Sequence, residues 1–360
     1  MPPSAILVSV FALLLALLAP AVRSMTLTDD DLRNIPSPGD DFNIKNGKLL
    51  APILIPRVAG TEGSLRAQQH FVDFFRDNLP EWTIQWQNTT SKTPVTGDKD
   101  VPFSNLIFRR DPPGSNPGEV GRLTLVAHYD SKYEPTGFIG ATDSAAPCAM
   151  LMHVARSIEQ ALKAKWELDD GLDEPKGVQI LFLDGEEAFL HWTDTDSLYG
   201  ARTPLDSISL FLLLDLLGTS EPRVPSYFLT THWAYRAMAL LEKRMRDLGV
   251  LEANPASPFL PESDKEASRF TRSYVDDDHR PFMERGVDIL HIIPSPFPKV
   301  WHKMEDDGEH LDLPTTRDWA KITTAFVVEW MGIQDQMPKL SVTKAKRSAT
   351  VKTTSQRTEL

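Results

Sequence analysis

The chain is poor in cysteine, in basic relative to acidic residues, and in the glycine motifs of common enzyme classes. Its 360 residues include one cysteine, which excludes an internal disulfide and any metal site built from several thiolates. Lys and Arg number 38 against 50 Asp and Glu, and the net charge of −12 argues against nucleic-acid binding. Neither Gly-x-Ser-x-Gly nor Gly-x-Gly-x-x-Gly occurs, so a serine hydrolase and a nucleotide cofactor both lack a signature. A metal site here would need His, Asp and Glu.

The two ends of the chain differ in composition from the rest. Residues 5–22 are almost all apolar and precede small residues, which predicts a secretory signal peptide over residues 1–24. An uncleaved membrane anchor is the alternative, but Pro20 interrupts the run. Residues 338–360 are rich in Ser, Thr, Lys and Arg and are expected to form a disordered basic tail. Residues 28–337 are expected to form a single domain.

Export has further consequences for the chain. The signal peptide predicts a secreted protein, or one resident in the lumen of the endoplasmic reticulum or Golgi. The sequon Asn88-Thr89-Thr90 makes Asn88 a candidate for N-glycosylation. We expect no membrane contact beyond the signal peptide, and a monomer.

Short apolar runs alternate with amphipathic stretches along the chain. The expected strands are residues 104–110, 122–127, 178–183, 209–214 and 287–293, of which the first two are expected to form a hairpin or edge pair. The expected helices are residues 62–78, 146–165, 231–248 and 315–330, with a surface loop over 254–269. This alternation predicts an α/β fold, a three-layer α/β/α sandwich around a central mixed, mostly parallel twisted sheet.

Polar residues gather where the expected strands end, which is where α/β folds place their functional groups. The candidates are His128, Asp143, Glu186, Glu187, Asp215, Asp277, His291 and His302. Several have simpler explanations. Asp143 could cap the helix that begins near Pro147, Glu186 and Glu187 could be solvated turn carboxylates, and His291 could be a core histidine.

Asp215 is harder to explain as a structural residue. It lies in an apolar run, where an unpaired carboxylate costs about several kcal/mol. Trp192, Phe297 and Trp301 could be packing residues, but aromatic residues beside polar ligands in proline-rich loops are typical of a pocket lining. Taken jointly, Asp143, Glu187 and His302 form the two-carboxylate, one-imidazole set of a catalytic zinc site with an open position.

Eight segments in order resemble the glutaminyl-peptide cyclotransferases, relatives of the di-zinc aminopeptidases. They are His128–Tyr133, Gly140–Ala145, Pro147–Met150, Phe182–Trp192, Asp196–Gly200, Leu214–Gly218, Asp277–Phe282 and Leu290–His302, and the resemblance spans about residues 45 to 335. It implies a zinc-dependent enzyme that converts the N-terminal glutamine, and possibly glutamate, of peptides or proteins to pyroglutamate and, from glutamine, releases ammonia.

The resemblance also implies roles for individual residues. Asp143, Glu187 and His302 would bind one zinc ion per chain, Glu186 would transfer protons, and Asp215 and Asp277 would be hydrogen-bonded carboxylates beside it. Trp192, Phe297 and Trp301 would form the pocket for the glutamine side chain, with His291 near its rim. Secreted animal members pair the cysteine at position 148 with one at position 127; this chain has Ala127, so Cys148 is expected to be unpaired.

A secreted di-zinc aminopeptidase is the alternative function. Its second metal would need His128, Asp143 as a bridge, and Asp215, and all three are present. The ligand residues alone therefore leave both functions open, while Trp192 and Trp301 favour the cyclotransferase because they fill space that a hydrolase needs for water and varied side chains.

Overall fold

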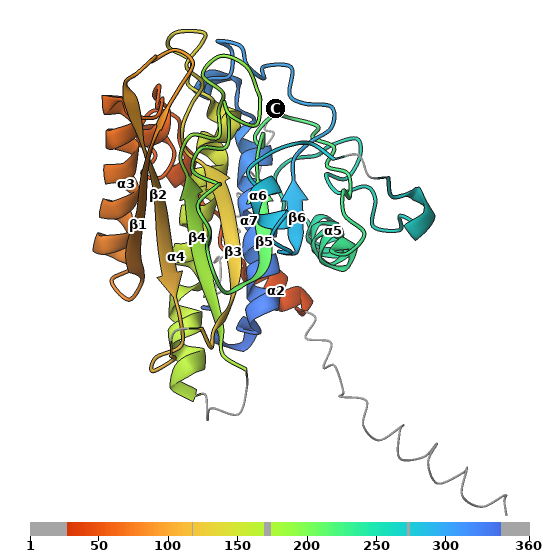
Figure 1. Cartoon of the computed structure of the whole chain (residues 1–360). Helices are drawn as coiled ribbons and strands as arrows, with labels where there is room; N and C mark the ends of the chain where they lie inside the picture. The colour runs from red at the N-terminus through yellow and green to blue at the C-terminus, as the bar shows by residue number, and fades with distance from the viewer. Residues whose placement is uncertain (1–26, 117, 169–173, 272–273, 340–360) are drawn as a thin grey trace, which may run out of the picture.

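The computed structural model describes residues 27–116, 118–168, 174–271 and 274–339. A six-stranded sheet in the order β1-β2-β4-β3-β5-β6 runs through it (Figure 1). The strands are β1 (Thr83–Lys92), β2 (Asp100–Arg110), β3 (Gly121–His128), β4 (Lys176–Leu183), β5 (Ile208–Leu214) and β6 (Ile289–Ile292). β4, β3, β5 and β6 are parallel, whereas β1 and β2 pair antiparallel. The expected mixed, mostly parallel sheet is confirmed.

The two faces of the sheet are covered unequally. The main core lies between the sheet and five helices (Figure 1). They are the short helix α2 (Asp29–Asn34) and the long helices α3 (Glu62–Asn78), α4 (Ala146–Leu168), α5 (His232–Asp247) and α7 (Leu313–Met331). A smaller cluster on the other face includes Leu198, Phe211 and Phe282. The single-turn helix α6 (Arg280–Met283) and the irregular segment after β4 cover that face, so the third layer of the sandwich is thin.

Helices α3, α4, α5 and α7 lie close to the positions expected from the sequence, and capping residues mark the starts of two of them. The Thr61 side chain accepts a hydrogen bond from the Ser64 amide at the start of α3. Asp312 accepts one from the Thr315 amide at the start of α7, and Gly332, with φ of 61°, ends that helix. No helix within the described ranges is both long and apolar enough to cross a membrane.

The expected pairing of residues 104–110 with 122–127 is wrong. β4 lies between β2 and β3, and β2 pairs with β1 on its other side. β3 is apolar and buried almost throughout, so it needs a partner on each edge, and β4 and β5 supply them. β1 was not expected at all, because its side chains are mostly exposed and polar and no apolar run marks it.

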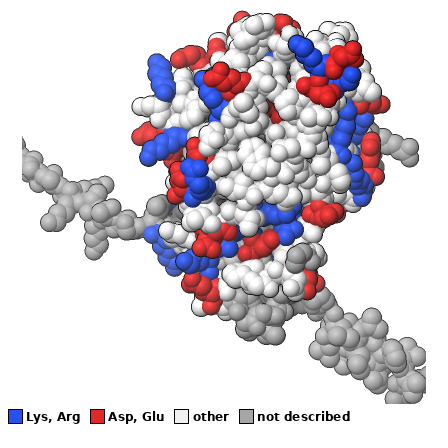
Figure 2. Space-filling model, turned by 60° about the vertical axis from the view of Figure 1, so that its left-hand side comes forward, with Lys and Arg blue, Asp and Glu red and all other residues white. Residues whose placement is uncertain are grey.

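Several expectations concern the surface and the ends. The predicted signal peptide and residues 340–360 of the predicted tail lie outside the described residues. Asn88 is exposed on β1. Acidic and basic side chains are interspersed on the face shown in Figure 2, and no continuous basic band crosses its described part. The unpaired Cys148 is buried in α4, with its Sγ 3.2 Å from the carbonyl oxygen of His128.

Candidate active site

The carboxyl ends of the parallel strands meet at one edge of the sheet, around a cavity of about 420 Å³. Its lining combines acidic, basic and aromatic side chains, including Lys132, Asp143, Glu186, Trp192, Asp215, Phe297, Trp301 and His302. A larger groove of about 800 Å³ runs along α5, but its lining contains no histidine. Of these two, only the cavity at the strand ends combines histidine with several acidic side chains, as acid–base and metal chemistry require.

Asp143, Glu187 and His302 come from three separate segments, and their ligand atoms lie within 4.8 Å of one another. His302 Nε2 is 3.5 Å from Asp143 Oδ2 and 3.5 Å from Glu187 Oε2. Both of these oxygens are buried and accept no hydrogen bond from the described residues. Buried carboxylates are costly unless a cation compensates them, and zinc accepts this combination of ligands. The three residues therefore fit one metal ion.

Two glycines allow the ligand segments to adopt their conformations. Gly140 has φ of +61°, and a Cβ there would lie 2.1 Å from the carbonyl oxygen of Asp143. Gly185 has φ of +70°, and a Cβ there would lie 2.4 Å from the Phe103 ring. A side chain at either position would displace the turn that carries Asp143 or the segment that carries Glu186.

Glu186 lies beside the group formed by Asp143, Glu187 and His302 but is not a member of it. Burial raises the pKa of its carboxyl well above the usual range, and the nearby charges of Glu187, Asp277 and Asp278 add to the rise, whereas His128 opposes it. Burial likewise raises the pKa values of Asp277 and Asp278. A carboxyl group with a raised pKa can accept and return a proton near neutral pH.

His128 lies among three carboxylates. Its Nε2 is 3.0 Å from Asp143 Oδ1 and 3.3 Å from Asp215 Oδ1, and its Nδ1 is 3.4 Å from Asp130 Oδ1. Burial alone would lower the pKa of His128, but the surrounding carboxylates raise it well above its usual value. Asp215 Oδ1 also accepts hydrogen bonds from the Ser144 hydroxyl and the Leu216 amide. His128, Asp143 and Asp215 form a second set whose geometry would suit a cation.

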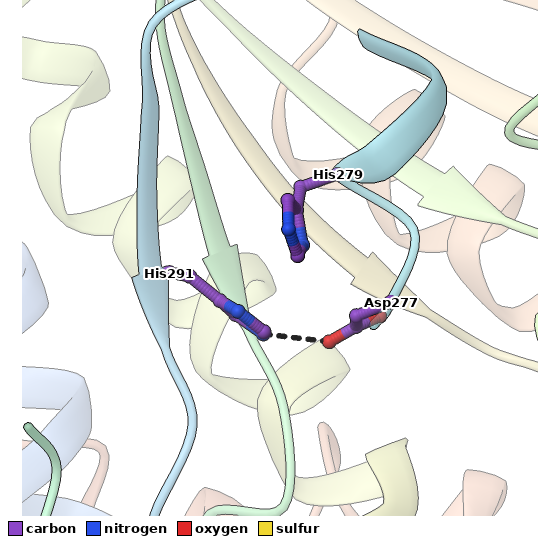
Figure 3. A group of neighbouring side chains, drawn as sticks. All are labelled: Asp277, His279 and His291. Atoms are coloured by element: carbon purple, nitrogen blue, oxygen red, sulfur yellow. Dashed lines mark hydrogen bonds and ion pairs between the residues drawn. The ribbon is translucent and has the colours of Figure 1, made fainter. Parts of the chain in front are cut away.

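A third set contains Asp277, His279 and His291 (Figure 3). His291 on β6 points toward Asp277, with its Nε2 2.7 Å from Asp277 Oδ2, and the His279 ring lies 4.6 Å from the His291 ring. Burial lowers the pKa of His291 to about 3, so its imidazole is neutral at physiological pH. The side chain is fully buried and does not line the cavity. The expected position of His291 at the pocket rim is therefore wrong, because β6 directs this side chain into the interior.

Comparisons with known proteins identify the family of this chain. The profile of peptidase family M28 matches residues 105–327. A glutaminyl-peptide cyclotransferase from Bothrops jararaca is 38% identical over 307 residues, which cover 79% of this chain and 80% of its own. The chain belongs to the glutaminyl-peptide cyclotransferase family.

Solved structures extend the comparison from sequence to fold. The glutaminyl cyclase of Macrostomum lignano superposes with a TM-score of 0.66 at 27% identity, over 87% of this chain and 94% of that one. A Zn-dependent exopeptidase from Parabacteroides distasonis superposes with a TM-score of 0.58 at 17% identity, over 81% of this chain and 98% of that one. The latter is a likeness of fold alone. Membership of the cyclotransferase family, expected from the eight segments, is thus confirmed.

The aromatic residues singled out by the family resemblance lie at the cavity mouth of this cyclotransferase-family chain. Trp192 is 39% exposed and Trp301 is 36% exposed. The Phe297 and Trp301 rings meet edge to face with centroids 4.8 Å apart, and Trp301 stacks on His302 at 3.9 Å. An apolar wall therefore lies directly beside the metal-ligand group.

Two supporting carboxylates of this family member were missed by sequence reasoning. Asp130 accepts hydrogen bonds from the amides of Glu186 and Glu187, at 3.1 Å each. Asp306 accepts from the amide and hydroxyl of Thr142, next to Asp143. Asp130 lies two residues after the end of β3, so its place at a strand end was a usable signal. Asp306 lies in a loop that no sequence pattern connects to Thr142.

Proposed function

We propose that this chain is a glutaminyl-peptide cyclotransferase that uses one zinc ion. Its substrate is a peptide or protein with N-terminal glutamine. The α-amine attacks the side-chain amide carbon, the C–N bond to the amide nitrogen breaks, and ammonia leaves as a five-membered lactam forms. The observation that carries the proposal is the group of buried, donor-free carboxylate oxygens of Asp143 and Glu187 beside His302, next to the high-pKa carboxyl of Glu186.

Asp143, Glu187 and His302 would hold the zinc ion. When bound, zinc supplies Lewis-acid stabilisation of negative charge on the amide oxygen. The fit of the residues rests on their donor-free oxygens and on the mixture of two carboxylates and one imidazole. Lys132, whose Nζ is 3.5 Å from Glu187 Oε2, offsets only part of the negative charge in the group.

Glu186 would move the proton that the reaction must transfer. The α-nitrogen loses one proton as the lactam forms, and the amide nitrogen gains one as it leaves. Glu186 accepts the first and delivers the second, and its raised pKa suits both steps. Asp277 and Asp278 favour the protonated form of Glu186 through their charge.

The neighbouring carboxylates are tied down by other groups. His291 holds Asp277 by a 2.7 Å hydrogen bond, and Ser144 and the Leu216 amide hold Asp215. They would therefore keep fixed positions while Glu186 changes protonation state. Trp192, Phe297 and Trp301 would fold the glutamine side chain back toward the amine, which supplies the proximity that a unimolecular ring closure needs.

A di-zinc aminopeptidase is the second candidate function, because His128, Asp143 and Asp215 lie close enough to hold another ion. One observation weighs against it. Asp215 Oδ1, the oxygen that faces His128, already accepts hydrogen bonds from the Ser144 hydroxyl and the Leu216 amide.

One assay separates the two functions. The purified protein is incubated with Gln-initiated and Leu-initiated peptides, and ammonia release is compared with free leucine. Ammonia without leucine and one zinc per chain are expected. Release of leucine with two zinc ions per chain would instead identify an aminopeptidase, and release of neither product would disprove both candidates.

The sequence also carries signals for export and glycosylation. We infer cleavage of residues 1–24, a single domain over 28–337, secretion as a monomer, and N-glycosylation of Asn88. The exposed position of Asn88 on β1 supports the last point, since the transferase must reach the side chain. Intact mass and glycosidase treatment of protein secreted by eukaryotic cells, compared with Asn88→Gln, test cleavage and glycosylation together, while light scattering tests the monomer.

A further inference from the structure

A guanidinium group joins two loops at the mouth of the candidate active site. Arg280, the first residue of α6, donates through Nη1 to Asp276 Oδ2 at 2.8 Å and through Nη2 to Asp194 Oδ1 at 2.6 Å. Asp276 Oδ2 also accepts the indole N–H of Trp192 at 3.4 Å. One carboxylate oxygen of Asp276 therefore contacts both the guanidinium and the indole. The Nε of Arg280 additionally lies 3.5 Å from Oε1 of Glu284, the residue that follows α6.

The contact with Asp276 restrains the Trp192 indole, whose loop is held elsewhere by other groups. The inner part of its loop is fixed, because Asp196 accepts hydrogen bonds from the amides of Phe189, Leu190 and His191. The indole itself is 39% exposed, and within the described residues its N–H has no hydrogen-bond partner other than Asp276. A hydrogen bond that restricts the rotamers of an exposed aromatic side chain lowers the entropy cost of ordering it when a ligand binds.

Arg280 contacts Asp276, whereas the neighbouring Asp277 is held by other groups. Asp277 is fixed by His291 and by the Asp278 amide, so a change at Arg280 leaves the Asp277 contacts in place. The contact network thus separates the wall of the cavity from the carboxyls around Glu186. Loss of the Arg280 contacts should alter binding and spare the chemical step.

We propose that Arg280 is a positioning residue that holds Trp192 against the cavity through Asp276 and Asp194 and thereby sets the affinity for the N-terminal glutamine. This inference rests on the proposed cyclotransferase function. Arg280 does not line the cavity, so it acts only through the residues that it holds.

The kinetic test uses Arg280→Gln, with Arg317→Gln as the control. Arg317 also lies near the start of a helix, α7, is similarly buried, and pairs with an acidic residue, Glu252, neither of which lines the cavity. Arg280→Gln is expected to raise KM for a Gln-initiated peptide by about 3- to 10-fold with kcat within about twofold of wild type. Arg317→Gln should change neither KM nor kcat. Arg280→Lys keeps the positive charge but loses the second donor nitrogen that bridges Asp276 and Asp194, so its KM should lie between those of wild type and Arg280→Gln.

A double-mutant cycle tests whether the effect passes through Trp192. Trp192→Phe should raise KM, and adding Arg280→Gln in that background should change it by less than about twofold. The inference would be overturned if the two substitutions raised KM independently, so that their fold-changes multiplied in the double mutant. An unchanged KM in Arg280→Gln, or a fall in its kcat without a rise in KM, would also overturn it.

A readout without substrate separates this inference from the proposed function. The acrylamide quenching of Trp192, obtained as the difference between each protein and its Trp192→Phe version, should rise in Arg280→Gln and stay unchanged in Arg317→Gln. If wild type releases no ammonia, the cyclotransferase function fails, and the quenching still decides whether Arg280 holds Trp192. Equal quenching in wild type and Arg280→Gln would overturn the positioning role even in an active enzyme.

Discussion

Asp130 provides a quantitative test of how the metal-ligand segment is supported. Its two carboxylate oxygens accept the amides of Glu186 and Glu187, and both hydrogen bonds are buried. Asp130→Ala leaves two buried amides without an acceptor, and each costs about 1–3 kcal/mol. The free energy of unfolding should therefore fall by about 2–6 kcal/mol. Because Glu187 is then free to reorient, zinc affinity should also fall by about 10- to 100-fold.

Asp318 offers a matched control for the loss of stability. It is also buried and accepts two consecutive amides, those of Glu252 and Ala253, at 2.7 and 3.0 Å. Asp318→Ala should lose a comparable part of the unfolding free energy, toward the lower end because its amides are only partly buried. Zinc affinity and turnover should stay near wild type, because neither amide belongs to the site.

The assay combines urea unfolding of the metal-free proteins with competition for zinc against a chromogenic chelator. If Asp130→Ala does not fold, Asp130→Asn replaces it, because its one remaining acceptor oxygen should make the loss of stability smaller. Wild-type zinc affinity in both Asp130 variants would refute the reasoning. So would an equal loss of zinc affinity in Asp318→Ala, because the effect would then come from general destabilisation.

Four further outcomes are expected. Glu186→Gln should reduce kcat by about 10²- to 10⁴-fold while zinc content, measured by plasma emission, stays unchanged; substantial residual turnover would contradict its role. His302→Ala should lower zinc stoichiometry in the same measurement, and full occupancy would remove His302 from the ligand set. Gly140→Ala should displace Asp143 and weaken zinc binding, whereas Gly39→Ala, with φ of +52° and no atom within 4 Å of its Cβ, should only lose about 1 kcal/mol of stability. His153 is buried with its pKa lowered to about 4 from 6.5, so the unfolded state binds a proton that the folded state excludes, and stability should fall as pH drops through this range. Urea unfolding should show wild type losing up to about 3 kcal/mol more than His153→Gln between about pH 7 and pH 4, and parallel curves would contradict this.

The parts of the fold that follow from local patterns could be predicted from the sequence. The helix over residues 62–78 has a polar cap at Thr61 and an apolar face, and β5 is an unbroken apolar run. β1 could not be predicted, because an exposed edge strand needs no apolar side chains. The order of β2, β4 and β3 could not be predicted either, since strand pairing depends on contacts between distant segments.

The candidate site divides in the same way. Asp143, Glu187 and His302 could be proposed together because each follows an expected strand and parallel strands end at one edge. The interior position of His291 could not be inferred, because alternation along a four-residue strand buried on both faces carries no signal of direction. The contacts of Asp306 with Thr142 and of Arg280 with Asp194 join segments far apart in the chain, and only the folded arrangement reveals them.

The single thiol of Cys148 can report the unfolding of this protein. Burial raises the pKa of Cys148 to about 12, so the folded molecule holds almost no thiolate at physiological pH. The unfolded chain exposes the same group with an ordinary cysteine pKa, and it can then react with a maleimide or disulfide reagent. Labelling therefore counts the molecules in which α4 has separated from β3, with a stoichiometry of one per chain. Because zinc would bind only the folded protein, in which the ligand residues are close together, adding zinc should slow this labelling without binding the sulfur.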